Sequence, residues 1–485
     1  MRLLLLIALF FHCSALNGTQ IAHDLQYVLS SGSRFYFPND AAWDADTTQR
    51  FDTWHAPTYI ISIKPALVTD VQEVVRYASF HGIPFLATGG GHGYSGSLGA
   101  LENGIELDLG YFNSVTIDTA NNMMTVGGAV TFSGVEETCY RAGKAFPVGA
   151  CSCVGVAGAS LGGGIGFYSG LYGAISDSLV SADIITGTGA QVTASETQNS
   201  DLLWALKGAG SSYGVVTSLT YRIYDFVNDG YAMNADMVFP ASQMSALLTF
   251  ANSWLEGQPK ELSIILTPRY DATQQELLVT VNVVYAGPLA EGHYIIRPLL
   301  DLAPQRSNVS YLPWYEISDA ASFGAIASSC DDSPRAIIPY SLNLYEIDVE
   351  ALTAAIQCFN DAVASTPALQ NIQISFTQYA QYGFQQHLQN SSSFPYRDVA
   401  MFVEIDGVAA QAENIPIIDA FEREFRDRLV NISGRNALEV YMQFAHGDEG
   451  ADAWFSAANV PKLRRLKELY DPLDLFRFYN SVNTD

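Results

Sequence analysis

A glycine-rich stretch from Phe146 to Gly173 constrains the fold of this chain more than any other part of the sequence. Nine of its 28 residues are glycine, at positions 149, 155, 158, 162, 163, 164, 166, 170 and 173, against an average share of about 7%. Glycine costs roughly 0.5–1 kcal/mol inside regular structure, so a folded chain keeps so many only where backbone approaches another group closely. Apolar residues such as Val148, Leu161 and Phe167 lie among the glycines, unlike in a flexible linker. We therefore expect a buried loop system that wraps a large, phosphate-bearing ligand.

A second glycine cluster lies at the end of a predicted β-α-β unit. Residues 59–65 alternate like a strand, residues 69–82 have apolar side chains at helical spacing, and residues 83–88 are a second strand. This strand continues directly into Gly89-Gly90-Gly91-His92-Gly93-Tyr94-Ser95-Gly96. A glycine turn after a strand offers backbone N–H groups to an anion, with no side chains in the way. It is not the G-x-G-x-x-G dinucleotide fingerprint, because the spacing differs and no long helix follows.

Five motifs in a fixed order resemble one protein family. They are Gly90-Gly91-His92-Gly93-Tyr94, Gly149-Ala150-Cys151-Ser152-Cys153-Val154-Gly155, Gly162 to Gly164, the block Asp201 to Gly208 with Gly214-Val215-Val216-Thr217, and Tyr470-Asp471-Pro472 through Phe476 to Asn480-Ser481-Val482. Together they resemble the FAD-linked oxidoreductases of the vanillyl-alcohol-oxidase fold, specifically the berberine-bridge-enzyme-like group. The resemblance covers roughly residues 55–225 and 435–485.

The resemblance implies FAD as the cofactor, and we expect no metal site. It implies that His92 holds the flavin through its C8 methyl group and that Cys151 holds it through C6, with 151 − 92 = 59 positions between them. Cys153 is the alternative attachment residue. Bonds to an imidazole and a sulfur should raise the potential of the ring and retain the cofactor in a secreted enzyme. The other cofactor-binding residues implied are Thr88, Gly89, Gly90, Gly91, Gly93, Val154, Gly155, Gly158, Gly162, Gly163, Gly164, Gly166, Gly214, Val216 and Asn480.

Two tyrosines, Tyr441 and Tyr94, are the candidate catalytic bases. A base must reach the substrate and have a pKa near the working pH. Tyr441 lies in an expected strand, 439–444, where some family members use a tyrosine as base. Three further titratable residues are candidates for which a structural role is the simpler interpretation: His446, Glu404 and Asp406.

One residue is expected to control oxygen access, and three others differ from the family pattern. Val154, three residues after Cys151, is the small gate residue that the resemblance associates with oxidases. Gln443 and Phe444 stand where the family has Asn and Tyr, and Ala159 stands where it often has His. These departures keep a flavin-binding protein without turnover as an alternative.

The alternation of helices and strands predicts an α+β fold with a FAD-binding domain of the vanillyl-alcohol-oxidase type, built from two subdomains. We expect residues 20–226 to form this domain and residues 436–485 to complete it. Residues 227–435 should form an inserted substrate-binding domain, an antiparallel sheet covered by helices. Its expected strands are 263–268, 276–285, 341–346, 372–379 and 399–405, and its expected helices are 241–256, 289–302 and 349–366.

The N-terminus and the charge of the chain bear on location and partners. Residues 1–15 have one Arg, a short apolar core and a small-residue end, typical of a secretory signal peptide. Four Asn-x-Ser/Thr sequons predict a glycoprotein: Asn17, Asn308, Asn390 and Asn431. The net charge of −26 would repel nucleic acid and anionic membrane. We expect a secreted protein that has neither as a partner.

The cysteines are odd in number once the signal peptide is removed. Of six, Cys13 lies in that segment and five remain. At least one therefore lies outside an internal disulfide, and attachment of Cys151 to the flavin would leave four. Cys330 with Cys358 is a plausible bridge, although the connectivity stays open.

These features predict a secreted FAD-dependent oxidase. We expect it to take a hydride from an alcohol, a phenolic or another ring-bearing metabolite, in secondary metabolism, and to pass electrons to molecular oxygen to give peroxide. One alternative is a carbohydrate oxidase of the same fold, which peroxide release with oligosaccharides would reveal. The other is a non-catalytic flavin-binding secreted glycoprotein, whose flavin no substrate would reduce although sulfite would still attack it.

Overall fold

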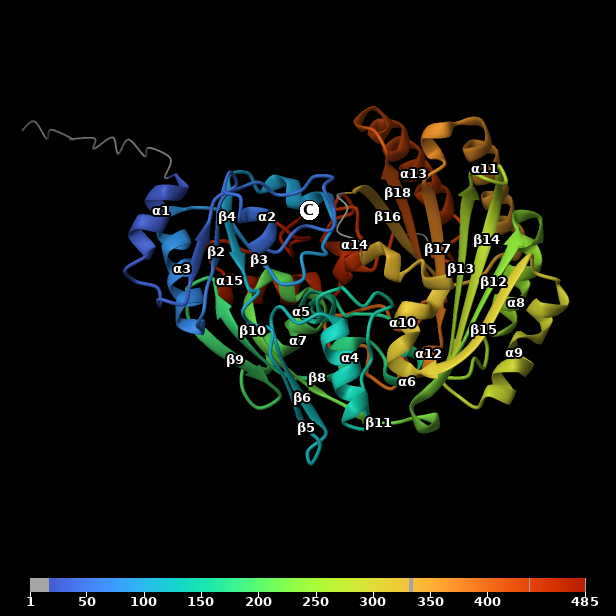
Figure 1. Cartoon of the computed structure of the whole chain (residues 1–485), viewed down its shortest axis with the longest axis horizontal. Coiled ribbons are helices and arrows are strands. Elements are labelled where there is room, and N and C mark those ends of the chain that lie inside the picture. Colours follow the sequence, from blue (N-terminus) through green and yellow to red (C-terminus); the bar gives the residue numbers. More distant parts are fainter. Residues whose placement is uncertain (1–16, 331–334, 436, 485) are drawn as a thin grey trace, which may run out of the picture.

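The structure, a computed structural model, describes residues 17–330, 335–435 and 437–484. The predicted signal peptide, residues 1–15, lies outside these ranges. Figure 1 shows two halves side by side: one combines the blue and green elements with the red C-terminal helices, and the other is a yellow-to-orange sheet with helices on its outer side. Within the described ranges, no helix has both the length and the apolar character needed to cross a bilayer.

The first sheet carries the predicted β-α-β unit. Its strands lie in the order β1 (Arg34–Tyr36), β2 (Tyr59–Lys64), β4 (Gly104–Asp108) and β3 (Phe85–Thr88), and both β2 and β3 run parallel to β4. The connecting helix α3 (Val68–His81) buries its apolar face and ends at Gly82, whose φ of +65° is the left-handed conformation that favours glycine. The unit is confirmed, and it delivers the end of β3 to the glycine turn that starts at Gly89.

The second sheet is antiparallel, and residues of the glycine-rich stretch pack against it. Its order is β5 (Val115–Asp118), β6 (Met123–Gly127), β10 (Gly214–Arg222), β8 (Leu179–Thr186) and β9 (Gln191–Ser195). The associated helices are α4 (Phe132–Arg141), α5 (Val156–Leu161), α6 (Ser169–Tyr172) and α7 (Ser200–Ala209). The core of this half is continuous with C-terminal residues such as Trp454 and Leu463.

A seven-stranded antiparallel sheet forms the other half, as the sequence predicted. Its order is β15 (Arg306–Pro313), β12 (Tyr231–Pro240), β14 (Glu276–Tyr285), β13 (Leu262–Asp271), β17 (Ile372–Tyr379), β18 (Met401–Ala409) and β16 (Ala336–Leu344). Helices α8 (Met244–Ser253), α9 (Leu289–Asp301), α11 (Val349–Ser365) and α13 (Ile415–Val430) lie on its outer side (Figure 1). Strands β12 and β15 and helix α13 were not among the expected elements.

The alternation along β18 decides which side chains can reach the first half. Met401, Val403 and Ile405 belong to the core between the sheet and its helices. Their neighbours Phe402 and Glu404 therefore point to the opposite face, because successive strand residues alternate. That inner face lies against the glycine motifs.

The end of the chain returns to the first half. Helices α14 (Ala451–Phe455) and α15 (Val460–Tyr470) follow α13, and the buried Lys467 of α15 donates hydrogen bonds to Ser212 O at 2.8 Å and Asp471 Oδ2 at 2.6 Å. The expected strand at 439–444 is wrong: this segment is irregular and ends in a 3₁₀ turn, Met442–Phe444. Val440 N donates to Ala453 O of α14 at 3.0 Å, and Glu439 O accepts from Asn343 N of β16 at 2.8 Å.

Short elements complete the two halves. They are α1 (Gly18–Leu25), α2 (Trp43–Asp46), β7 (Lys144–Ala145), β11 (Tyr224–Asp225), α10 (Ile317–Ala320) and α12 (Gln381–Gln385), and β7 pairs with β11.

Buried carboxyl groups should make the folded protein more stable in acid. Burial raises the pKa of Asp52, Glu106 and Glu136 to about 7 each. Between their unfolded values and pH 7 the folded chain therefore binds more protons than the unfolded chain, so the free energy of unfolding falls as pH rises through that interval. We expect a higher Tm at pH 5 than at pH 8, measured by thermal unfolding at constant ionic strength. A Tm that rises from pH 5 to pH 8 would contradict the raised pKa values of these three carboxyl groups.

Candidate functional site

The two glycine motifs meet face to face. A Cβ added to Gly90 would lie 2.8 Å from Gly155 N, and one added to Gly155 would lie 3.1 Å from Gly90 N. Real Cβ atoms essentially never show the first distance, and the second is unusually tight, so glycine, above all at position 90, lets these two loops touch. The sequence predicted close backbone approach in both motifs, and part of what they approach is each other.

The turn after β3 leaves its backbone N–H groups free. From Gly90 to Ser95, none of them donates a hydrogen bond to any residue that the structure describes. The carbonyls are used instead: Gly91 O accepts from Phe51 N at 3.1 Å, and Gly93 O accepts a short hydrogen bond from the Arg50 guanidinium. A row of unpaired N–H groups beside a guanidinium is the donor set that an anionic group such as a pyrophosphate requires.

His92 is held as a neutral imidazole within this turn. Its ring stacks on Phe51 with centroids 3.8 Å apart and planes 15° apart. Burial, and the nearby positive charge of Arg50, lower the pKa of His92 to about 4. A neutral ring retains a nucleophilic nitrogen at physiological pH, and Nε2 lies 3.5 Å from Cys153 Sγ.

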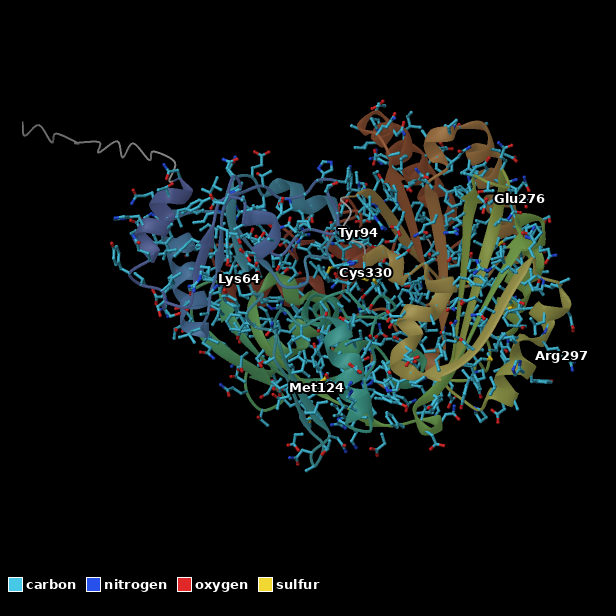
Figure 2. All side chains as sticks on the ribbon, viewed as in Figure 1. Lys64, Tyr94, Met124, Glu276, Arg297 and Cys330 are labelled. Carbon is cyan, nitrogen blue, oxygen red and sulfur yellow. A yellow bond between two sulfur atoms is a disulfide. The ribbon has the colours of Figure 1, made fainter. Side chains whose placement is uncertain are left out.

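Three cysteines converge beside His92. Cys153 forms a disulfide with Cys330, which belongs to the 3₁₀ turn Ala327–Cys330 of the other half. Cys151 is a free thiol, and its Sγ lies 3.4 Å from each of these two sulfurs and 3.4 Å from Ser329 Oγ. A His92 ring nitrogen and the Cys151 and Cys153 sulfurs all lie within 4.8 Å of one another. Figure 2 shows Cys330 and Tyr94 near the boundary between the halves.

The expected Cys330–Cys358 bridge is wrong. Cys358 is a free, exposed thiol on α11, on the outer side of the seven-stranded sheet, while Cys330 reaches across to the Cys151–Cys153 loop. Cys139 is also free, buried beside Met124, so the four cysteines other than Cys151 form one bridge rather than two. The pairing spans 177 residues and depends on how the halves pack, which spacing alone does not reveal.

The cluster of His92 with two cysteines is not a metal centre in this form of the protein. The disulfide leaves Cys153 without a thiolate, so one imidazole and one thiol remain. Structural zinc sites take four ligands.

Removing the Cys153–Cys330 bridge should destabilise the protein. A disulfide that closes a loop of 177 residues stabilises mainly by restricting the unfolded chain, and its loss typically costs about 2–5 kcal/mol. We expect the double variant C153S/C330S to show a clearly lower urea midpoint. C358S is the matched control, since Cys358 is exposed and unbridged. Equal midpoints for the two variants would show that the bridge does not contribute.

Several glycines of the second motif are required by packing within the protein. A Cβ at Gly162 would lie 2.3 Å from Gln443 Nε2, one at Gly163 would lie 2.4 Å from the Phe394 ring, and one at Gly166 would lie 1.9 Å from Val148 O. Gly158 differs, because it is exposed and no atom lies within 4 Å of its Cβ position. At positions 162, 163 and 166, contacts within the protein therefore already require glycine, whether or not a cofactor approaches the backbone there.

Residues of β10 connect to the first motif through close backbone contacts. A Cβ at Gly89 would lie 2.6 Å from Gly128 O, and one at Gly128 would lie 2.3 Å from Val216 O. Gly214 packs against Ile184 at the start of the same strand. Thr88, Gly89 and Val216 thus lie in one region, between the two sheets of this half, and Gly214 lies further along β10.

Tyr94 and Glu404 join the two halves at the site. The Tyr94 hydroxyl donates a short hydrogen bond to Glu404 Oε1, and both side chains are half-buried. Burial raises the pKa of Glu404 to about 7, despite the stabilising Tyr94 hydroxyl. Burial and the charge of Glu404 raise the pKa of Tyr94 and also that of Asp406, the next residue on the same face of β18. A carboxyl group that titrates near neutral pH is suited to accept and release a proton.

Tyr441 lies in an apolar setting. It is 4% exposed and packs against Phe394, Phe402 and Phe444. Its hydroxyl accepts from Gly164 N at 3.1 Å, and burial raises its pKa. Burial outweighs the Gly164 N–H, which by itself favours the phenolate, and holds the phenol in its neutral form. The geometry therefore favours Tyr94 with Glu404 over Tyr441 as the proton acceptor.

His446 is held by its own contacts, as the structural interpretation expected. Its Nδ1 lies 2.9 Å from Pro339 O, and its ring stacks on Tyr340 with centroids 4.0 Å apart.

Asn480 and Gln443 tie the C-terminal return to the site. Asn480 is fully buried, and its Oδ1 accepts from Ser95 Oγ at 2.7 Å while Nδ2 donates to Met442 O at 3.0 Å. Gln443 donates to Gly158 O at 2.5 Å and accepts from the Tyr479 hydroxyl at 2.8 Å. The Gln443 departure therefore has a structural role: its long amide reaches backbone carbonyls within α5.

Some residues of the site were not among those singled out from the sequence. Arg50 and Phe51 come from the irregular segment before β2 and belong to no motif. In the structure Arg50 donates a hydrogen bond to Gly93 O, and the Phe51 ring stacks on His92. Tyr479 precedes Asn480 and lies against Gly93, and Ser329 contacts Cys151 only through the packing of the halves. Only Tyr479 was within a recognised motif.

Comparisons with known proteins agree with this arrangement. A FAD binding domain model matches residues 60–195, and a "Berberine and berberine like" model matches residues 440–483. The FAD-linked oxidoreductase azaL of Aspergillus niger is 37% identical over 456 residues, covering 90% of this chain and 93% of that protein.

Two solved structures share the fold at lower identity. The Physcomitrella patens BBE-like 1 protein superposes with a TM-score of 0.83 and 19% identity, covering 96% of this chain and 98% of that one. The glucooligosaccharide oxidase of Acremonium strictum, which carries a 6-S-cysteinyl, 8α-N1-histidyl FAD, gives a TM-score of 0.80 with 20% identity over 96% of this chain and all of that one. With two family models at the two ends of the flavin half and a relative that matches nearly the whole length, this chain belongs to the berberine-bridge-enzyme-like FAD-linked oxidoreductases of the vanillyl-alcohol-oxidase fold.

Proposed function

We propose that this chain is a secreted oxidase whose FAD is held by His92 and Cys151, and that it oxidises an alcohol, a phenolic or another ring-bearing metabolite with molecular oxygen. The observation that carries the proposal is the Tyr94–Glu404 pair beside His92. The Phe51 ring stacks on the His92 ring, with centroids 3.8 Å apart. It also meets the Tyr94 ring edge to face, with centroids 6.3 Å apart. Attachment point and proton acceptor are thus within one small region.

The residues present fit FAD. The unpaired N–H groups of 90–95 suit its pyrophosphate or ring oxygens. Cys153 is used in the disulfide, so Cys151 is the free sulfur within 4.8 Å of a His92 nitrogen. The doubly attached FAD of the Acremonium strictum enzyme supports the same pair here. When bound, FAD supplies the two-electron acceptor for a hydride.

The protein's own contribution to the reaction is proton transfer and positioning. Glu404 takes the proton of the substrate hydroxyl through Tyr94, whose O–H it already accepts. The hydrogen on the substrate carbon leaves as hydride. Overall, an alcohol and O₂ become a carbonyl compound and H₂O₂, which balances atoms and electrons.

An aromatic wall favours a ring-bearing substrate. On the same inner face as Glu404, Phe402 belongs to a cluster with Tyr379, Phe384 and Phe394. Such a surface offers offset and edge-to-face contacts to a planar substrate. Val154, half-buried beside the cysteines, is the small residue proposed to leave oxygen a path.

Secretion is supported by the four sequons. Their asparagines, Asn17, Asn308, Asn390 and Asn431, are all exposed, as glycosylation requires. Endoglycosidase treatment of the secreted protein should reduce its mass, and an unchanged mass would contradict glycosylation.

Oxygen uptake and peroxide formation test the activity directly. The purified protein is screened against aromatic and aliphatic alcohols, phenolics and oligosaccharides. We expect peroxide in a one-to-one ratio to oxygen with members of the first groups. Turnover restricted to oligosaccharides would establish a carbohydrate oxidase instead. Flavin that reacts with sulfite, but that no substrate reduces, would establish a non-catalytic binding protein.

A further inference from the structure

A polar cavity lies apart from the candidate flavin site. Its volume is about 450 Å³, which is within the range of about 300–1,000 Å³ typical of small-molecule sites. Its walls come from both halves: the start of β8, Lys207 in α7, Arg222 at the end of β10, and α12 with the residues after it. The segment 163–177 separates it from the flavin site, since Gly164 faces Tyr441 and Asp177 lines the cavity.

Lys207 brings an unpaired ammonium group to this cavity. Its side chain is half-buried, and among the described residues no carboxylate lies within 4.0 Å and no hydrogen-bond acceptor is in reach. The residue lies at a break in α7, where Gly208 follows with φ +155° and the Lys207 carbonyl accepts from Phe394 N at 3.0 Å. Its backbone is therefore fixed. Burial lowers the pKa of Lys207, as expected for a cation with too little counter-charge.

The buried carboxylate of the cavity is already neutralised. Asp177 accepts from both terminal nitrogens of Arg397, at 2.5 and 2.8 Å, and from Ala174 N at 2.9 Å. Its oxygens are thus engaged by a bidentate partner and a backbone donor. Asp177 has no remaining need for Lys207.

The charge left over in the cavity is positive. Arg222 is a second, exposed cation, and its side chain makes no ion pair or hydrogen bond with any described residue. Glu196, exposed, is the opposing acid. His387 lies 4.0 Å from Asp177, and burial lowers its pKa, which leaves a neutral ring that can donate or accept. The cavity thus has one half-buried and one exposed cation against one exposed acid, in a chain of net charge −26.

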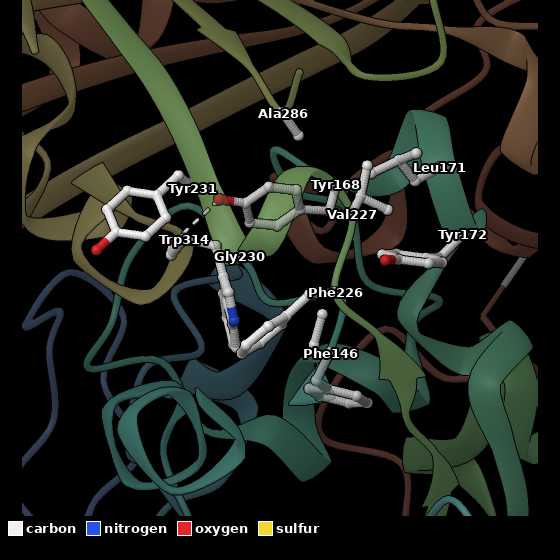
Figure 3. A pocket seen from close by; sticks show the side chains of 11 residues that line it. Phe146, Tyr168, Leu171, Tyr172, Phe226, Val227, Gly230, Tyr231, Ala286 and Trp314 are labelled. Atoms are coloured by element: carbon white, nitrogen blue, oxygen red, sulfur yellow. Dashed lines mark hydrogen bonds between the residues drawn. The ribbon is translucent and has the colours of Figure 1, made fainter. Parts of the chain in front are cut away.

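Apolar rings stand beside these cations. Tyr172 and Tyr224 stack with centroids 4.1 Å apart, and the Tyr224 hydroxyl lies 3.0 Å from Ser178 Oγ. Leu171 and Tyr172 also line the small apolar crevice of Figure 3, together with residues such as Phe226 and Trp314. That crevice, at about 20 Å³, holds no more than one small group. The polar cavity thus has a charged end and an aromatic wall.

We propose that this cavity binds a small organic anion, a carboxylate or phosphate ester with a ring or short chain. Its oxyanion takes charge-assisted hydrogen bonds from Lys207 and Arg222, and its apolar part lies against Tyr172. The Ser178 hydroxyl is a further donor. Tyr172 comes from the glycine-rich stretch and Lys207 from the Asp201–Gly208 block, but neither residue lies in the two loops that meet beside His92 at Gly90 and Gly155.

Calorimetric titration of the purified, flavin-loaded protein tests this site. The probes are benzoate, phenyl phosphate and inorganic phosphate, each at pH 6 and at an ionic strength held constant with NaCl, with chloride alone as baseline. We expect saturable binding to one site, with phenyl phosphate tighter than inorganic phosphate. K207M and R222Q should each bind at least tenfold more weakly, and E196Q should bind more tightly. K207R should retain binding.

R297Q is the matched control, because Arg297 is exposed on α9 at the far side of the other half (Figure 2). Its affinity should equal that of the unmodified protein. Heats no larger than those of chloride, or the same affinity in K207M and R297Q, would overturn the proposal. If K207M does not fold, R222Q and E196Q decide in its place, and unchanged affinity in both would overturn it.

Discussion

Glu404→Gln is expected to lower kcat by about 10²–10⁴-fold, the usual contribution of a general base, while FAD stays attached. The active form is the carboxylate, and burial raises its pKa to about 7. The kcat/KM of the unmodified enzyme should therefore rise with pH and level off above that value. Glutamine cannot titrate, so this limb of the profile should vanish in the variant. Oxygen uptake between pH 5 and 9, on the substrate found in the screen, measures both effects.

Two further variants separate proton transfer from simple loss of structure. Tyr94→Phe removes the hydroxyl through which the proton reaches Glu404 and should lower kcat to a similar extent. Glu276 lies at the start of β14 in the same sheet, away from Tyr94, and Glu276→Gln should have no effect (Figure 2). Activity of Glu404→Gln within threefold of the unmodified enzyme, with the pH limb intact, would rule out Glu404 as the base.

His92→Ala combined with Cys151→Ser is expected to abolish covalent attachment of the flavin. After acid precipitation, the yellow chromophore should remain with the unmodified chain and with each single variant, and should pass into the supernatant for the double variant. The physical reason is that these are the one free thiol and the one neutral imidazole at the cluster. Peptide mass after proteolysis identifies the attachment residues.

The choice of cysteine is tested in the same experiment. Cys358→Ser should leave attachment unchanged, because that thiol lies on α11. A flavin that stays on the double variant would show that Cys153 serves instead, with the bridge to Cys330 opened. If the flavin passes into the supernatant when the unmodified chain is precipitated with acid, the protein holds its FAD without a covalent bond.

The sequence predicted those elements whose pattern is local. The strands 276–285 and 372–379 have the predicted bounds, and the helix after β2 ends at Gly82 as its glycine indicated. In each case the period of apolar residues and the terminating residue lie within a few positions of each other.

Strand β12 shows why other elements escaped. It carries the fully buried Asn234 and Asp236 in the middle of the strand, which breaks the apolar pattern. These side chains are satisfied by each other and by Asn282 of β14, at 2.7–2.9 Å. A buried polar group is tolerated only with such a partner, and the partner is 46 or 48 positions away.

By itself, the sequence determined the family, the fold class and the two glycine motifs, because their residues are close together in the chain and need only backbone geometry. The tertiary structure alone decided which groups meet. It paired Cys153 with Cys330 and left Cys151 free, it placed Phe51 on His92, and it brought Tyr94 against Glu404 from the other half. It also left Lys207 without a partner, since Arg397 had taken Asp177. Such pairings depend on the packing of two separately formed sheets, where a shift of a few ångströms decides which charges and sulfurs touch, and no local pattern records that distance.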